Sequence, residues 1–312
     1  MALRSYRAVI ALAVLALTAC SRNVKSIPPV LEGISLLGDT LWSVPVPIQG
    51  GRERVTRLYE AREQLQRSPG EFQAAYEVAR YTADLGRFSK AIVLYGDAAA
   101  MGGLDPRPYA RRGELYLLLR RIDRGYSDLR IAERLFTGEP KVELQVTNGG
   151  DMQPRLLSYS IPHLLGIAAL VRGEVPRAIG YFSASASYVE SLQGAIHATL
   201  WFRVSQPDSA FPPTLPRRFR AATNAMLANA SRGATAPACR TGTGPMVDPD
   251  LLCLARASRL LAQGKRDEAL ATFGLIRRRA HWSAEPHLVA EAVTARLMPE
   301  SEPVPTGGRP RQ

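Results

Sequence analysis

The chain has 312 residues, enough for one large domain or two small ones, so the size of a hydrophobic core is not limiting. Forty Lys and Arg against 28 Asp and Glu give a net charge of +12, which favours acidic partners such as anionic lipids, acidic protein faces or nucleic acid. Because the basic residues form no block of five or more, we expect no nucleic-acid binding.

Residues 1–19 have the features of a cleaved leader. Arg4 and Arg7 make its start positive, and residues 8–17 are an apolar stretch too short for a membrane-spanning helix of about twenty residues. The stretch ends in Leu-Thr-Ala-Cys, which resembles the lipobox of bacterial lipoproteins. The resemblance implies cleavage before Cys20, alkylation of its thiol with diacylglycerol and, since no Asp follows the cysteine, anchoring at the periplasmic face of the outer membrane. A plain secretory signal and the inner membrane are the alternatives.

Residues 20–50 contain four prolines and are predicted to form the lipidated N-terminus and a tether. No later segment has eighteen apolar residues in a row, so the acyl chains are the expected anchor. Within the tether, a stripe of apolar residues has helical spacing: Val30, Ile34, Leu37 and Leu41. We expect this stripe to pack on the first helices of the domain, and contact with the membrane surface is the alternative.

Residues 51–298 are predicted to form one domain of repeated helical hairpins. Residues 79–95 align with residues 113–129 at an offset of 34, and two further copies follow around Gly166 and Ala257. Small residues recur where the two helices of a hairpin meet, and a glycine or arginine recurs at the turn between them. The pattern resembles the tetratricopeptide repeat family across about residues 70–136, 159–192 and 250–283. The resemblance implies an all-α fold, a right-handed solenoid of helical hairpins with loop insertions.

The remaining segments are predicted from local patterns. A helix face covers residues 55–65, a degenerate hairpin covers residues 193–231, and a closing helix covers residues 286–298. Of the two insertions, the first contains an alternating stretch at residues 141–146 that predicts a short strand, and the second is rich in Gly, Ala, Pro and Thr. The polar tail at residues 299–312 is predicted to be disordered.

Chemistry-bearing motifs are absent from the sequence: it has no HExxH, CxxC, GxSxG, phosphate loop or GxGxxG. We therefore expect no enzyme activity, no cofactor and no metal, and we interpret the histidines as solvated surface residues. They are His163, His197, His281 and His287. Cys239 and Cys253 are a disulfide candidate in an exported chain, with two buried free thiols as the alternative.

The resemblance also implies a function, because tetratricopeptide arrays bind proteins or peptides on a concave face lined by the first helix of each hairpin. We expect a membrane-anchored scaffold or adaptor of the bacterial cell envelope that holds an envelope protein or peptide in this groove. Counting at helical spacing from Ala79 gives six partner-binding candidates: Tyr76, Arg80, Arg107, Glu114, His163 and Ile167. The alternatives are a module that binds acidic envelope lipids or glycans through its arginines and, after it, an envelope hydrolase.

Overall fold

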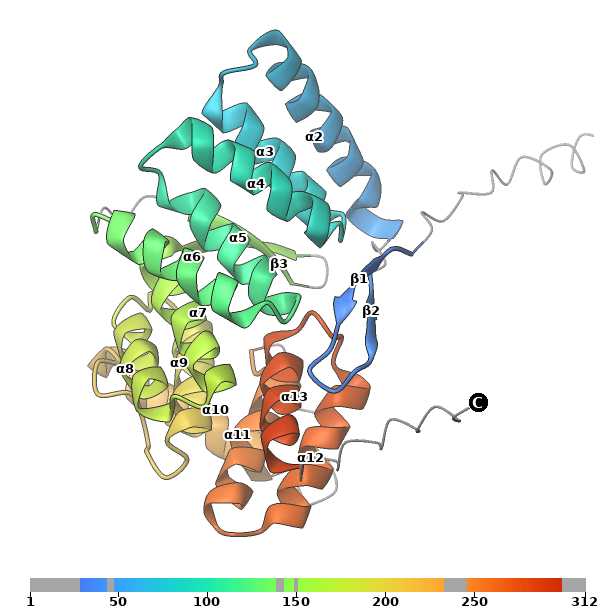
Figure 1. The fold of residues 1–312 in the computed structure, drawn as a ribbon. Helices are drawn as coiled ribbons and strands as arrows, with labels where there is room; N and C mark the ends of the chain where they lie inside the picture. The colour runs from blue at the N-terminus through green and yellow to red at the C-terminus, as the bar shows by residue number, and fades with distance from the viewer. Residues whose placement is uncertain (1–28, 44–47, 139–142, 149–150, 233–245, 299–312) are drawn as a thin grey trace, which may run out of the picture. The chain divides into compact units, whose positions relative to one another are not determined.

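The computed structural model describes residues 29–43, 48–138, 143–148, 151–232 and 246–298, and the chain from Leu31 onward forms one compact unit. The predicted all-α class is confirmed: twelve helices dominate these ranges, and the sheets within them are two two-stranded hairpins (Figure 1). None of these helices is both long and apolar enough to cross a membrane. The helices are α2 (Ile48–Arg67), α3 (Phe72–Asp84), α4 (Phe88–Gly102), α5 (Pro106–Leu118), α6 (Ile122–Leu135), α7 (Leu157–Arg172), α8 (Val175–Ala186), α9 (Leu192–Ser205), α10 (Arg217–Arg232), α11 (Pro249–Ala262), α12 (Arg266–Arg279) and α13 (Glu285–Leu297).

Four helical hairpins coincide with the four predicted copies of the repeat. They are α3–α4, α5–α6, α7–α8 and α11–α12, and in each the two helices pack against one another. The predicted degenerate hairpin is present as α9 and α10, and the predicted closing helix as α13. From α2 to α9, each helix also contacts the next along the chain, which is how stacked hairpins bury faces that a single hairpin leaves exposed.

The turn between the two helices adopts a left-handed backbone in all four hairpins. Gly86, Gly173 and Gly264 have φ values of 70°, 79° and 75°, as expected for residues that close a helix. Arg120 occupies the equivalent position in the second hairpin with a φ of 61°, and it is the one non-glycine residue with positive φ in the described ranges. An L-residue pays a steric penalty there, so other contacts must hold Arg120 in place.

Small residues bring the paired helices together, as the repeat pattern predicted. A Cβ added to Gly125 would lie 2.9 Å from the carbonyl oxygen of Gly113, so α5 and α6 meet backbone to backbone. A Cβ added to Gly166 would lie 2.6 Å from the ring of Phe182, which fills the space between α7 and α8. Both approaches are closer than any side chain permits.

The C-terminal helices fold back onto the middle of the chain. Helix α13 packs against α7, and α11 packs against α9. In an open solenoid each hairpin contacts only its neighbours, so the contact of α13 with α7 departs from the simplest form of the predicted repeat array, whereas α9 and α11 belong to neighbouring hairpins. As a result α7 is covered by α6, α8 and α13, and most of its residues are buried.

The segment predicted to be a tether with a helical stripe contains a β-hairpin instead. Strands β1 (Leu31–Ile34) and β2 (Thr40–Trp42) pair antiparallel, and Gly38 in the connecting turn has a φ of 90°. Tertiary hydrogen bonds select this hairpin over the helix: the carboxylate of Glu32 accepts from the backbone N–H of Ser89, and the carbonyl of Trp42 accepts from the indole of Trp282.

A second hairpin lies in the first predicted insertion. Strands β3 (Glu143–Asn148) and β4 (Asp151–Leu156) pair antiparallel, which confirms the predicted short strand to within two residues. Both strands contact α7. The predicted leader, Cys20, the second insertion up to residue 245 and the predicted disordered tail lie outside the described residues.

Candidate functional site

The six predicted partner-binding residues do not form an exposed face. Tyr76, Arg80, His163 and Ile167 are all buried, with exposed fractions of 8% or less. Arg107 and Glu114 are partly exposed. The expected exposure is therefore wrong for four of the six: Tyr76 contacts Tyr95 of α4 and Arg107 of α5, and α13 packs against α7.

Tyr76 belongs to an aromatic and cationic contact between α3, α4 and α5. Its ring centroid lies 5.7 Å from that of Tyr95, and the guanidinium of Arg107 lies 4.9 Å from the Tyr76 ring centroid. Arg107 is held in turn by Asp105, whose carboxylate also caps α5 by accepting from the Arg107 backbone N–H. Burial raises the pKa of Tyr76 to about 12, so its phenol is protonated at every physiological pH. These residues stabilise the hairpin stack and leave no surface for a partner at Tyr76.

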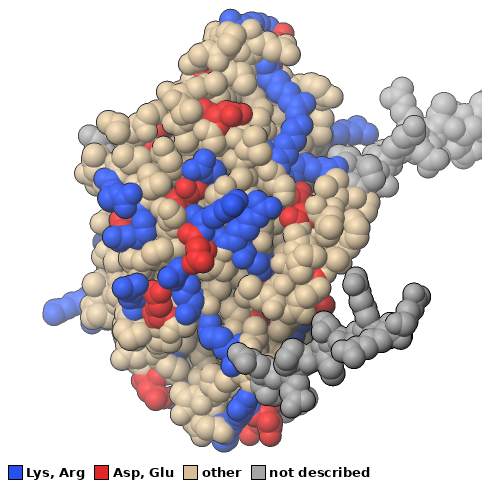
Figure 2. Space-filling model, in the orientation of Figure 1, with Lys and Arg blue, Asp and Glu red and all other residues tan. Residues whose placement is uncertain are grey.

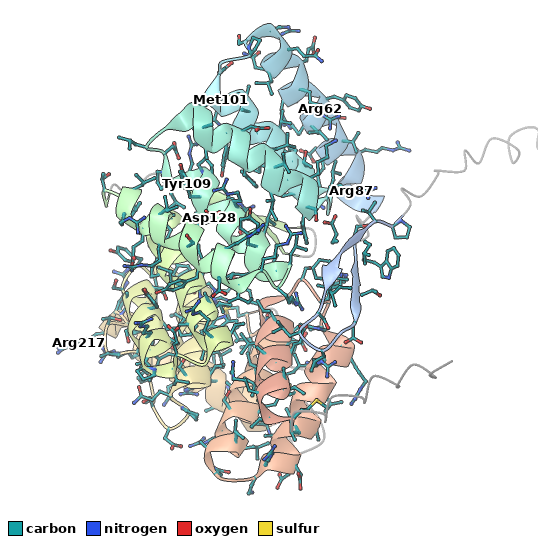
Figure 3. The ribbon with its side chains drawn as sticks, viewed as in Figure 1. Arg62, Arg87, Met101, Tyr109, Asp128 and Arg217 are labelled. Atoms are coloured by element: carbon teal, nitrogen blue, oxygen red, sulfur yellow. The ribbon has the colours of Figure 1, made fainter. Side chains whose placement is uncertain are left out.

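Buried and half-buried arginines are paired with carboxylates throughout the first two hairpins. Arg80 pairs with Glu77, and Arg111 pairs with Glu114 one repeat later. Arg112 donates two hydrogen bonds of 2.6 and 2.9 Å to Asp128 of α6, and its guanidinium lies 5.6 Å from the ring centroid of Tyr109 of α5. Tyr109 and Asp128 are labelled in Figure 3. Several arginines that the sequence suggested for binding an acidic partner are thus paired with carboxylates of the chain itself.

An open depression lies between α2 and α3, at the start of the helical array. We call it the α2–α3 depression; it has a volume of about 310 Å³, and its lining residues are Arg57, Glu60, Ala61, Gln64, Glu71, Gln73, Ala74, Glu77 and Tyr81. Three carboxylates and one arginine line it; Glu77 is also ion-paired with Arg80 beside the lining, so the lining and Arg80 together carry a net charge of −1, the opposite sign to the whole chain. The sequence analysis did not predict this depression, because α2 is not a copy of the repeat.

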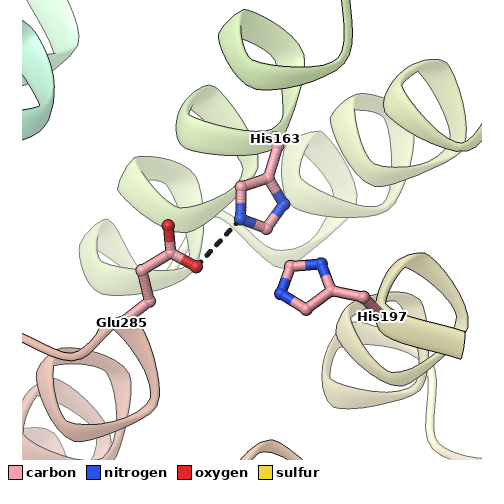
Figure 4. Close-up of side chains that lie close together, drawn as sticks. All are labelled: His163, His197 and Glu285. Carbon is pink, nitrogen blue, oxygen red and sulfur yellow. Dashed lines mark hydrogen bonds and ion pairs between the residues drawn. The ribbon is translucent and has the colours of Figure 1, made fainter. Parts of the chain in front are cut away.

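A second candidate is a cluster of two histidines and a glutamate from three separate helices. His163 of α7, His197 of α9 and Glu285 of α13 each offer a ligand atom within 4.8 Å of the other two (Figure 4). The Nε2 of His163 lies 3.0 Å from the Oε2 of Glu285. His163 is 1% exposed, so the interpretation of this histidine as a solvated surface residue is wrong.

The hydrogen bonds of His197 fix its tautomer. The indole N–H of Trp201 can only donate, and it donates to Nε2 of His197 at 3.2 Å, so that nitrogen carries no proton. The proton of a neutral imidazole is then on Nδ1, which donates to the hydroxyl of Tyr159 at 2.8 Å. Both ring nitrogens of His197 are therefore engaged. The Nδ1 of His163, by contrast, is buried and has no hydrogen-bond partner in the described ranges.

Two imidazoles and a carboxylate form a donor set that suits zinc, and the 3.0 Å between His163 and Glu285 is compatible with a shared ion. The obstacle is His197, which would give up its bond from Trp201 and leave a fully buried indole N–H without an acceptor. The geometry therefore fits a hydrogen-bonded and stacked cluster that fastens α7, α9 and α13 together. The expected absence of a metal stays a prediction.

The cysteines bear on the predicted disulfide. Cys253 is buried in α11 and is disulfide-bonded. Cys239, its predicted partner, and Cys20 both lie outside the described residues. The pairing of Cys239 with Cys253 stays a prediction.

Comparison with known proteins gives no family assignment. No protein-family model matches the chain, and a search of curated proteins finds no matching relative. The resemblances to bacterial lipoproteins and to tetratricopeptide repeats therefore rest on the residues named above.

Proposed function

We propose that this chain is an adaptor of the bacterial cell envelope, anchored through acylated Cys20, that holds a segment of a partner protein in the α2–α3 depression. One observation carries the proposal: an acidic depression lined by polar side chains from two adjacent helices, in a chain whose net charge is +12. The helical hairpins supply a rigid support for it. Such hairpin arrays present peptide-binding surfaces in the tetratricopeptide family that the sequence resembles.

The side chains of the depression are positioned by bonds to one another. Gln73 donates to Glu77 across one turn of α3 at 3.0 Å, and Gln64 of α2 donates to Glu71 at 2.8 Å. These contacts order the side chains of the lining before a partner binds. Binding therefore costs less conformational entropy in the lining. A carboxylate-rich lining of this kind binds a lysine or arginine side chain through charge-assisted hydrogen bonds. The expected partner segment is therefore basic.

The distribution of arginine argues for a protein partner over an acidic lipid or glycan. On the face drawn in Figure 2, acidic side chains lie among the basic ones, and no large area of a single sign is present there. Buried arginines such as Arg80 and Arg111 are paired with neighbouring glutamates. An electrostatic site for an acidic polymer needs unpaired basic residues gathered on one face.

The anchor is tested by fractionation. No helix in the described ranges can span a membrane, so the acyl chains are the proposed attachment. We expect Cys20→Ala to move the protein from the membrane fraction to the soluble periplasmic fraction. A variant that stays in the membrane fraction after a high-salt wash would show that something other than acylation holds the chain.

The depression is tested by reversing one charge. Glu60→Lys places a cation in the lining, whereas Glu63→Lys makes the same change one turn further along α2 and outside the lining. The two residues are a matched pair, because both are exposed and each forms an ion pair with an arginine of α2. We expect Glu60→Lys to abolish recovery of the partner after crosslinking in cells and Glu63→Lys to leave it unchanged. Equal recovery from both would exclude this site.

A further inference from the structure

The β1–β2 hairpin buries two polar side chains and exposes several apolar ones, although Leu41 of β2 is buried in the core. Its polar Glu32 and Ser35 are buried, with exposed fractions of 4% and 8%, while Leu31, Ile34 and Trp42 are about half exposed at 49%, 52% and 49%. Thirteen large apolar side chains are exposed in the described ranges, and five of them lie within residues 30–42. An exposed apolar patch of this kind marks a surface that meets another apolar phase or molecule.

Hydrogen bonds to the helical domain fix which side of the hairpin faces outward. The carboxylate of Glu32 accepts from the N–H of Ser89 at 2.7 Å, and the N–H of Leu36 donates to the buried carboxylate of Glu291 at 2.5 Å. The hydroxyl oxygen of Ser35 accepts from two backbone N–H groups in the turn. Turning the hairpin over would break the bonds of Glu32 and Leu36 and would expose Leu41, which is buried, so these contacts hold Leu31, Ile34 and Trp42 on the outward side.

Two of the outward residues lie side by side. Leu31 and Trp42 are direct partners across the two strands, so their side chains are neighbours. The carbonyl of Trp42 accepts a hydrogen bond of 2.8 Å from the indole of Trp282, which holds this end of β2 against the helical domain.

We propose that this outward side of the hairpin sits in the lipid–water interface of the membrane that holds the acyl chains. The inference rests on the proposed acylation of Cys20. Ten residues separate Cys20 from Val30, so even a fully extended chain places the hairpin within about 35 Å of the membrane. Tryptophan is enriched at the level of the lipid head groups, where its amphipathic ring lies between apolar chains and water.

Quenching of Trp42 by lipid tests the proposal. The full-length acylated protein is reconstituted in phosphatidylethanolamine–phosphatidylglycerol vesicles with and without brominated acyl chains, which quench indoles that reach the interface. The other two tryptophans are internal references: Trp201 is fully buried and Trp282 is partly buried. We expect brominated lipid to quench the wild type, Trp42→Phe to remove most of that quenching, and Leu31→Ser with Ile34→Ser to reduce it about twofold or more, since the interfacial preference falls with apolar area.

The outcomes separate this inference from the proposed function. A chain whose N-terminal fragment has no acyl mass would overturn both. An acylated, membrane-bound chain in which brominated lipid does not quench Trp42 would overturn the membrane-seated hairpin alone and leave the adaptor standing. Loss of quenching together with a dimer in sedimentation would assign the patch to a second copy of the chain, which also contradicts the inference.

Discussion

Replacing Glu291 with glutamine tests the contact that closes the fold. Glu291 of α13 forms an ion pair with Arg120, with Arg120 Nη2 to Glu291 Oε2 at 2.7 Å and side chains that are 2% and 1% exposed. The same carboxylate accepts from the N–H of Leu36 and lies 3.5 Å from the Nε2 of His287. It therefore joins the turn of the second hairpin, the β1–β2 hairpin and the last helix.

The expected loss of stability in Glu291→Gln can be estimated from the negative charge that the substitution removes. Burial alone would raise the pKa of Glu291, but hydrogen bonds from His287 and Arg120, together with the Arg120 charge, outweigh it and lower the pKa from 4.5 to about 2. At 1.36 kcal/mol per unit, this shift corresponds to roughly 3 kcal/mol of stability. Removing one member of a buried ion pair costs about 3–5 kcal/mol when the other charge is left unpaired. We expect Glu291→Gln to cost roughly 3 kcal/mol, because glutamine keeps an acceptor but not the charge.

The shifted pKa of Glu291 also predicts how its contribution to stability changes with pH. Because folding lowers the pKa of Glu291, its contribution is fully present above pH 4.5 and is lost as the pH falls towards about 2. Urea unfolding followed by far-UV circular dichroism should show a difference between wild type and Glu291→Gln that shrinks across this window. The control is Glu268→Gln, at an exposed ion pair with Lys265, which should cost at most about 1 kcal/mol. A difference below about 1 kcal/mol at neutral pH, or one independent of pH, would refute this account of Glu291.

Further predictions concern the packing and the disulfide. Arg120→Gly removes a left-handed strain of roughly 1 kcal/mol but also the larger ion-pair contribution, so its melting temperature should fall; a rise would mean that strain dominates. Gly166→Ala should destabilise by about 1–3 kcal/mol, because its Cβ meets the Phe182 ring, and unchanged urea unfolding would contradict the packing. Cys253→Ser should cost about 2–4 kcal/mol relative to the oxidised wild type, and equal melting of oxidised and reduced wild type would argue against a stabilising bridge. Tyr76→Ala should cost about 3–5 kcal/mol of stability, and a near-wild-type melting curve would contradict the burial of this side chain.

Local features of the sequence were enough to predict the helical hairpins. The period of 34 residues, the small residues such as Gly113 and Gly166, and the turn positions such as Gly86 depend on contacts within or between adjacent hairpins. Arg120 was predicted as a turn residue by its register with Gly86, although its side chain gave no sign of the left-handed backbone.

Contacts between distant parts of the chain could not be predicted in the same way. His163 and Glu285 are 122 residues apart, and nothing in either segment indicates that α13 covers α7. One signal was available: residues 164–171 of α7 are all apolar or glycine, and a helix without a polar face is buried on all sides. The β1–β2 hairpin was missed because its apolar residues fit helical spacing, while the bonds that decide its structure come from Ser89, Glu291 and Trp282.

Photocrosslinking from the α2–α3 depression in intact cells tests the central proposal most directly. A photoreactive phenylalanine analogue is introduced at Tyr81, which lines the depression, or at Tyr59, which is an exposed tyrosine of α2 outside the lining. The adaptor account predicts one specific crosslinked protein from position 81, lost in the Glu60→Lys background, and none from position 59. The same products from both positions, or no product from position 81, would contradict a partner-binding role for the depression.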